Sequence, residues 1–234
     1  MVFMAKKKRK PLNPIIKILL LIFIVFLVIC NVIFYKGYIT YQAAINEISI
    51  EEKINSIKTQ ENYIKIEDVS KYYKDAVIAV EDHRFYKHKG IDLISTFGAL
   101  FSNIKTKSLG MGGSTITQQL AKNMYFSQKK EFTRKVAELF VALDLEKKLT
   151  KDEILELYVN IIYFGDGYYG IENASKGYYG KSANNLTLEE AIMLAGLPAA
   201  PSVYSPNVNK NLANQRYKQV ESAMKKYGYL KNEN

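Results

Sequence analysis

The chain has 234 residues, of which 48% are hydrophobic and 24% are charged. This composition excludes a disordered or collagen-like chain, and the single cysteine, Cys30, excludes internal disulfides and cysteine-based metal clusters. The formal net charge is +10, but six of the 33 basic residues precede residue 18, and no acidic residue does. We therefore expect a basic N-terminal tail and no nucleic-acid partner.

Residues 18–35 form an apolar run without a charged side chain. As a helix this run rises about 27 Å, close to the thickness of the hydrocarbon core of a bilayer. The basic cluster at residues 6–10 precedes the run and should stay in the cytoplasm. The pattern predicts a cytoplasmic tail over residues 1–17, a single transmembrane helix over residues 18–35, and an extracytoplasmic remainder. A cleaved signal peptide is disfavoured because no A-x-A site follows the run.

Beyond the anchor we expect a stalk or linker over residues 36–65 and one mostly α-helical domain over residues 66–234. A capping box opens a predicted helix over residues 150–158, and a second capping box opens one over residues 187–197. Apolar residues at helical spacing predict a third helix from about Phe132. Alternation typical of strands is scarce, so the predicted fold class is mostly α.

An acidic residue, Glu81, directly follows five apolar residues at 76–80. A carboxylate at the edge of a core suits general acid or base catalysis. The basic residues Arg84, Lys87 and Lys89 follow and could hold an anionic substrate. A helix end whose acidic residues pair with these cations is the structural alternative, and spacing alone favours it.

Residues 112–123 combine two glycines with a polar stripe. The glycines let the backbone approach a ligand closely, and Ser114 or Thr115 can cap the helix that follows. A helix N-terminus with Lys122 about two turns later predicts a cradle for phosphate oxygens. The segment is not a Walker loop, because no Gly-Lys-Ser/Thr follows the glycines. An exposed polar face is the alternative.

Two further patterns are ambiguous by themselves. Arg134 and Glu138 are four residues apart on a predicted helix, which favours an ordinary surface pair. Apolar residues recur at helical spacing from Phe97 to Ile104 and are followed by two lysines. This second stretch predicts either a core helix or an interfacial helix that dips into lipid.

Taken together and in this order, these segments resemble the peptidoglycan glycosyltransferases, a domain that also forms the glycosyltransferase half of bifunctional penicillin-binding proteins. The resemblance runs from about Val69 to Tyr204. Its five motifs lie at residues 81–90, 113–123, 134–138, 154–170 and 190–201. Many relatives carry an arginine where this chain has Gly98, so a cation at that point of the donor site is not carried over.

The resemblance implies a lysozyme-like, two-lobed, mostly α fold in the bacterial cell membrane. The acceptor would be the lipid-linked disaccharide-peptide lipid II, and the donor the growing glycan on undecaprenyl diphosphate. Glu81 would deprotonate the acceptor hydroxyl, with inversion at the anomeric carbon. Lys122, Arg134 and Lys135 would neutralise the departing diphosphate. Glu138 would orient these groups or bind a divalent cation, Mg or Mn; no metal site is assigned and no other cofactor is expected.

The resemblance also supplies a set of candidate site residues and partners. The candidate catalytic residues are Glu81 and Glu138. The candidate substrate-binding residues are Asp82, Phe85, His88, Ser114, Thr115, Thr117, Gln118, Gln119, Lys122, Asn123, Arg134 and Lys135. Expected partners are lipid II, the growing glycan, membrane lipid and other cell-wall synthesis proteins.

Alternatives remain open at this point. Three Ser-x-x-Lys matches lack a Lys-Thr-Gly partner, and few residues follow Pro206, so we expect a polymerase without a transpeptidase domain. A membrane-held enzyme that cleaves glycans is a second hypothesis, since related folds carry different chemistry. A scaffold that binds a cell-wall precursor or anionic lipid is a third.

Overall fold

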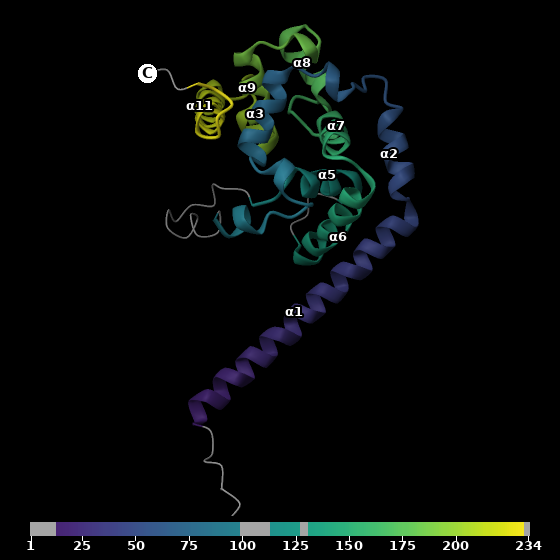
Figure 1. Ribbon diagram of the computed structural model, residues 1–234, viewed down its shortest axis with the longest axis vertical. Helices are drawn as coiled ribbons and strands as arrows, with labels where there is room; N and C mark the ends of the chain where they lie inside the picture. The colour runs from purple at the N-terminus through teal and green to yellow at the C-terminus, as the bar shows by residue number, and fades with distance from the viewer. Residues whose placement is uncertain (1–12, 99–112, 127–130, 232–234) are drawn as a thin grey trace, which may run out of the picture.

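The computed structural model describes residues 13–98, 113–126 and 131–231 (Figure 1). Helices dominate these ranges, and the only β pairing within them is two isolated bridges, Lys89 with Ile91 and Tyr163 with Tyr169. The predicted mostly α fold class is confirmed. The lysozyme-like, two-lobed arrangement stays a prediction.

The first helix, α1, runs from Pro14 to Glu47 and contains the whole predicted membrane span. Asn13 caps it, because the Asn13 side chain accepts a hydrogen bond from the Ile15 backbone N–H. Its most apolar stretch has a mean hydropathy of 3.1 and is not covered by the rest of the chain. By length and composition α1 can cross a membrane, which agrees with the predicted N-terminal helix. The helix projects far from the body of the protein in Figure 1.

The C-terminal part of α1 packs along α6, which spans Phe132–Lys148. Gly37 permits the close approach, since a Cβ atom there would lie 2.5 Å from Cβ of Val136. One turn further along α6, the ring of Phe140 contacts three aromatic rings of α1, those of Phe34, Tyr38 and Tyr41. The Tyr41 hydroxyl also hydrogen bonds to Asp144. The anchor is therefore joined to the body by side-chain packing.

The remaining helices form the body. Their bounds are α2 Ile50–Lys58, α3 Lys71–Glu81, α5 Ile116–Tyr125, α7 Lys151–Ile161, α8 Ile171–Tyr179, α9 Leu188–Gly196, α10 Pro201–Tyr204 and α11 Lys210–Lys226, with 3₁₀ turns at Ile66–Asp68, Phe85–Lys87, Ala183–Asn185 and Leu197–Ala199. Helices α3, α9 and α11 pack together at one side, while α5 lies between α6 and α7 (Figure 1). Helix α5 therefore lies at the centre of the body, and α6 lies on the side from which α1 leaves.

Local signals placed most of these helices correctly. Both predicted capping boxes are present, at Thr150 and Thr187, with side-chain and backbone hydrogen bonds in each. Helix α6 begins at Phe132 as predicted, and α7 continues three residues beyond Tyr158 because its apolar face stays buried. The stretch from Phe97 to Ile104 lies largely outside the described residues.

Residues 36–65, which we expected to link anchor and domain, contribute Tyr41, Ile50 and Ile57 to the hydrophobic core. Ser49 caps α2 through a capping box, so the chain turns from α1 into α2 without a flexible spacer. Beyond α2, the backbone of Ile64 exchanges two hydrogen bonds with the Asn160 side chain of α7. This segment is thereby fastened to the centre of the body.

Candidate active site

Glu81 is the last residue of α3, and both of its carboxylate oxygens have a partner. The Gln119 side-chain nitrogen donates to Oε2 at 2.7 Å, and the Arg216 guanidinium donates to Oε1 at 3.2 Å. The side chain is 12% exposed. The alternative interpretation of the sequence, that Glu81 pairs with the cations that follow it, is wrong, because the cation that pairs with Glu81 is Arg216 of α11.

Helix α5 carries the side chains that connect Glu81 to the basic residues. Thr115 caps the helix, since its hydroxyl accepts from the Gln118 backbone N–H while the Gln118 side chain accepts from the Thr115 N–H. Gln119 and Lys122 follow one helical turn apart and share a face. Gln119 contacts Glu81, so Lys122 lies on the same side of α5, next along the helix axis.

Around Glu138 the structure gathers positive charge. Arg134 donates to one oxygen of Glu138, and Lys135 donates to the other at 2.9 Å. Lys135 also donates to the Ser114 hydroxyl at 2.8 Å, which joins α6 to the segment before α5. Glu138 is only 1% exposed. The surface-pair interpretation of Arg134 and Glu138 is therefore wrong, because packing of α6 against α5 covers the pair.

Lys122 belongs to this charged group. Burial lowers the pKa of the Lys122 ammonium; the charge of Glu138 and that of Glu81 oppose the shift, while Arg134 and Lys135 add to it. Lys122 therefore lies within electrostatic range of both carboxylates. Three cations around one buried carboxylate leave a local surplus of positive charge, and an arriving anion would stabilise the charged form of Lys122.

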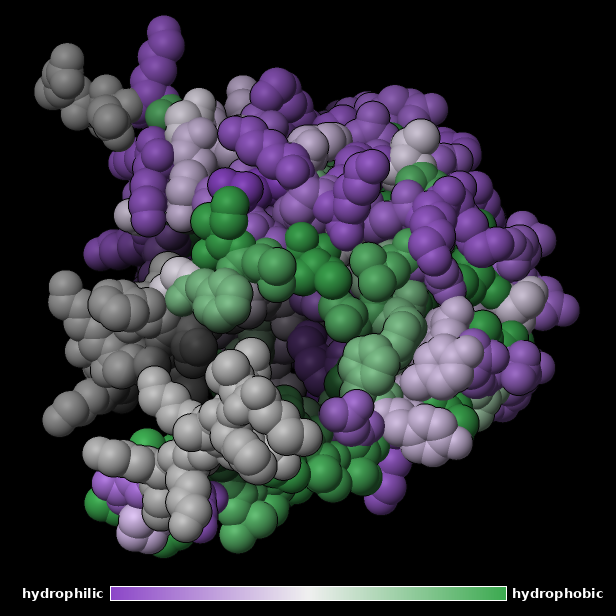
Figure 2. All heavy atoms as spheres, turned by 60° about the horizontal axis from the view of Figure 1, so that its bottom comes forward, coloured by the Kyte–Doolittle hydropathy of each residue, from purple (hydrophilic) through white to green (hydrophobic). Residues whose placement is uncertain are grey.

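One face of the molecule is hollowed. In Figure 2 hydrophobic side chains border this hollow, and hydrophilic residues are visible inside it. A shallow cavity of about 260 Å³ is lined by Glu131, Phe132, Arg134 and Lys135 at the start of α6. Arg134 and Lys135 are thus accessible from the surface at this cavity.

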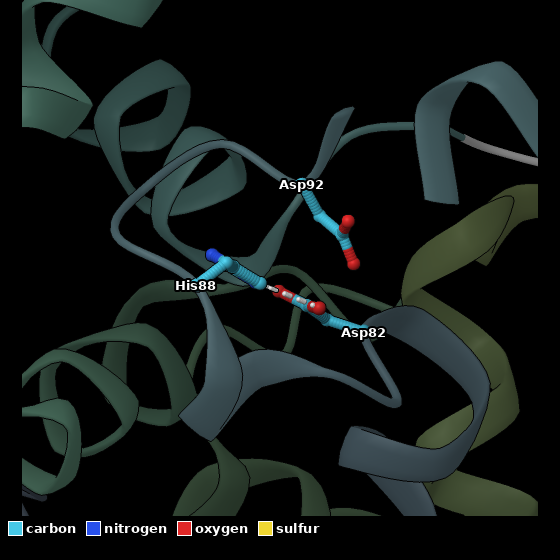
Figure 3. Close-up of side chains that lie close together, drawn as sticks. All are labelled: Asp82, His88 and Asp92. Carbon is cyan, nitrogen blue, oxygen red and sulfur yellow. Dashed lines mark hydrogen bonds and ion pairs between the residues drawn. The ribbon is translucent and has the colours of Figure 1, made fainter. Parts of the chain in front are cut away.

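Asp82 and His88 form a buried pair beside the site. The His88 ring nitrogen Nε2 lies 2.9 Å from Asp82 Oδ2, and the same oxygen accepts from the Ile116 backbone N–H at the start of α5 (Figure 3). Asp92 lies close enough for the three side chains to hold a metal ion. However, Asp92 already pairs with Arg84 and accepts from Ser95, so these negative charges have partners within the chain. The pair holds the N-terminus of α5 in place.

The other predicted site residues include several whose side chains make contacts within the fold. Phe85 is fully buried, with the Lys151 ammonium over its ring. The Thr115 hydroxyl donates to the Gly90 carbonyl, and the Thr117 hydroxyl donates to Glu146. These contacts are structural. Asn123 is half-buried on α5.

Sequence reasoning missed Arg216. Its guanidinium reaches Glu81, the Gly196 carbonyl and Gln219, and it lies over the ring of Tyr204. A signal was present, since the buried residues of α11 recur at Ala213, Val220 and Met224. An arginine within such an apolar stripe needs an internal partner.

Comparison with known proteins gives a consistent result. Residues 49–225 match the Transglycosylase family. Penicillin-binding protein 1A of Neisseria flavescens is 47% identical over 168 residues, which are 72% of this chain and 21% of that protein. A Cupriavidus necator protein whose name describes a transglycosylase is 42% identical over 188 residues, 80% of this chain and 81% of that protein.

A third relative covers more of this chain. Penicillin-binding protein 1F of Bacillus subtilis is 37% identical over 232 residues, which are 96% of this chain and 32% of that protein. The chain thus spans about a fifth of the Neisseria protein and about a third of the Bacillus protein. The Neisseria and Bacillus proteins are therefore much longer than the region that they share with this chain.

Proposed function

The chain belongs to the transglycosylase family, and on this premise we propose that it polymerises lipid II into peptidoglycan glycan strands. The donor is the growing glycan on undecaprenyl diphosphate, and the acceptor is the lipid-linked disaccharide-peptide. One observation carries the proposal: α5 presents Gln119 to the Glu81 carboxylate and Lys122 to the cations around Glu138. This arrangement supports a base beside an anion site.

Glu81 serves as the general base. Its carboxylate takes the proton of the acceptor hydroxyl while that oxygen bonds to the anomeric carbon of the donor. The bond between this carbon and the diphosphate oxygen breaks, and the electron pair leaves with the diphosphate. Attack from the face opposite the leaving group inverts the anomeric centre.

The cations stabilise the leaving group. Diphosphate leaves with its charge localised on oxygens, and Lys122, Arg134 and Lys135 supply the positive charge at that end. Glu138 holds Arg134 and Lys135 in place through both carboxylate oxygens. The nucleophile is a hydroxyl of the acceptor sugar itself, so alignment of the two sugars is the main remaining task.

Membrane attachment brings the body close to its lipid-linked substrates. Helix α1 spans the membrane once with the basic tail in the cytoplasm, and the body lies on the outer side. Both lipid-linked substrates then diffuse in the leaflet that faces the body. A divalent cation such as Mg or Mn would compete with Arg134 and Lys135 for the oxygens of Glu138, so we expect at most a modest effect of a chelator on the rate.

The test uses the purified full-length protein with lipid II in detergent or vesicles. We expect a ladder of long glycans from the wild type and none from Glu81→Gln, which keeps the shape of the side chain but cannot accept the proton. Asp75→Asn is the matched control, because Asp75 lies on the same helix and pairs with Lys71 at the surface.

Three outcomes would contradict the proposal. A full ladder from Glu81→Gln would falsify the assignment of the base. Release of soluble fragments from purified cell wall, with no lipid carrier present and no ladder from lipid II, would instead identify a glycan-cleaving enzyme. Binding of lipid II without either reaction would indicate a scaffold.

A further inference from the structure

A buried tyrosine stands behind the glutamine that contacts Glu81. Tyr158 lies on α7 with no exposed surface, and its hydroxyl donates to the Gln119 side-chain oxygen at 3.2 Å. The nitrogen of the same amide donates to Glu81 at 2.7 Å. The two ends of the amide therefore have different partners, one an acceptor and one a donor.

This arrangement selects one orientation of the amide. If the amide were flipped, its oxygen would face the carboxylate of Glu81, and two acceptors would oppose each other. Burial raises the pKa of the Tyr158 hydroxyl well above its usual range, and the negative charge of Glu81 raises it further. The hydroxyl stays protonated, so it remains a donor to Gln119.

Glu81 depends on this donor because it has few others. Among the described residues, its hydrogen-bond partners are Gln119 on one oxygen and Arg216 on the other. The charged and titratable groups around the carboxylate are Tyr73 and Asp82 from α3 and the residue after it, Lys122 from α5, Tyr158 from α7 and Arg216 from α11. Losing either donor would leave one carboxylate oxygen without its partner and free to rotate.

We infer that Tyr158 is a positioning residue for the transfer reaction, which orients the amide of Gln119 so that the Glu81 carboxylate stays directed at the acceptor hydroxyl. The inference rests on the proposed role of Glu81 as the base. Tyr158 itself is fully buried and acts only through Gln119.

The chain supplies a matched control. Tyr73 on α3 is equally buried, and the charge of Glu81 also raises the pKa of its hydroxyl after the larger effect of burial. In the described part of the chain, however, the Tyr73 hydroxyl has no hydrogen-bond partner. Two buried tyrosines thus flank the same carboxylate, and only one of them is bonded to Gln119.

The experiment compares Tyr158→Phe with Tyr73→Phe in the glycan assay at a series of lipid II concentrations. For Tyr158→Phe we expect kcat to fall about tenfold, the size expected when one hydrogen bond to a charged group is disturbed. KM for lipid II should stay unchanged, because Tyr158 acts through Gln119 on Glu81. Tyr73→Phe should match the wild type in both quantities.

A double variant separates positioning from packing. In a Gln119→Ala background, Tyr158→Phe should have no further effect on kcat, because the path to Glu81 is already broken. If Tyr158→Phe does not fold, Gln119→Ala alone must show the lower kcat with an unchanged KM. Equal losses from the two tyrosine variants, additive losses in the double variant, or a wild-type kcat in Gln119→Ala would overturn the inference. Loss of activity in Glu81→Gln with a wild-type Tyr158→Phe would overturn it while leaving the proposed function intact.

Discussion

The two ends of the site are built on opposite principles. At the carboxylate end each oxygen of Glu81 meets one donor, from α5 and from α11, and the charge is matched within the protein. At the cation end three basic side chains share the single buried carboxylate of Glu138, and positive charge is left over. The charge of the carboxylate end is therefore balanced within the protein, whereas the cation end, under the proposed function, receives the anionic leaving group.

Their supports differ as well. The carboxylate end is held by four helices of the body, with Tyr73 and Tyr158 buried beside it. The cation end lies on α6, which is backed by the membrane helix α1 through Gly37 and Phe140. Disturbing α1 should therefore affect the binding of the leaving group more than the base.

The largest effect should come from removing the shared carboxylate of the cation end. Glu138→Gln leaves three cations without their counter-charge, and breaking a buried pair of this kind costs about 3 kcal/mol. We expect a lower thermal midpoint and loss of glycan polymerisation. Added pyrophosphate should raise the midpoint of the variant more than that of the wild type, because it supplies the missing negative charge.

Glu131→Gln is the control for this prediction, since Glu131 is an exposed acid beside the same cations. Its midpoint should stay within about 0.5 kcal/mol of the wild type, as is usual at the surface. A Glu138→Gln protein as stable as the wild type would show that the cations repel one another less than their arrangement indicates.

The next largest effect tests the support from α1. In Gly37→Ala the new Cβ atom overlaps Val136, and overpacking of this kind costs about 1–3 kcal/mol. We expect faster hydrogen exchange in α6 and weaker use of lipid II, with an unchanged pH profile. Gly98→Ala is the control, because no atom of the described residues lies within 4 Å of a Cβ atom placed there. Equal exchange in the two variants would show that α1 does not brace α6.

A smaller loss is expected at the other end of the site. Arg216→Lys keeps the charge but loses the planar fork that contacts Glu81, Gly196 and Gln219 together. We expect kcat to fall about tenfold with little change in KM, because the side chain positions the base rather than the substrate. Lys218→Arg, an exposed change on the same helix, should be neutral. A rise in KM with normal kcat would place Arg216 in substrate binding instead.

The smallest effect concerns Glu156, which lies outside both ends. Burial acts to raise its pKa, but hydrogen bonds from Tyr63 and the Ile66 backbone, with the charge of Lys65, hold the pKa below the usual 4.5. Because the folded pKa is lowered, this group stabilises the protein above about pH 4.5, and the contribution is lost as pH falls through the folded value. The stability difference between wild type and Glu156→Gln should shrink on acidification, as measured by denaturation at a series of pH values. A stability difference that stays constant down to low pH would show that protonation of Glu156 does not contribute to acid unfolding.

The sequence predicted most of what is local. Capping boxes, helical spacing and the apolar run identify the helices at 132, 150 and 187 and the membrane span, because each depends on residues within about four positions of one another or on one continuous segment. The ordered motifs identified the family and most of the polar residues now seen together, including Glu81, Gln119 and Lys122.

Only the tertiary structure decided which of these residues meet and which are covered. Arg216 reaches Glu81 across 135 positions because α11 packs on α3 and α9, and Glu138 is buried because α5 lies against α6. Tyr158 finds Gln119 for the same reason, through the contact of α7 with α5. Periodicity within a helix shows which face is apolar, but packing between helices that are distant in sequence decides what that face contacts. The same packing decides which charged side chains meet, and so it determines the charge balance of this site.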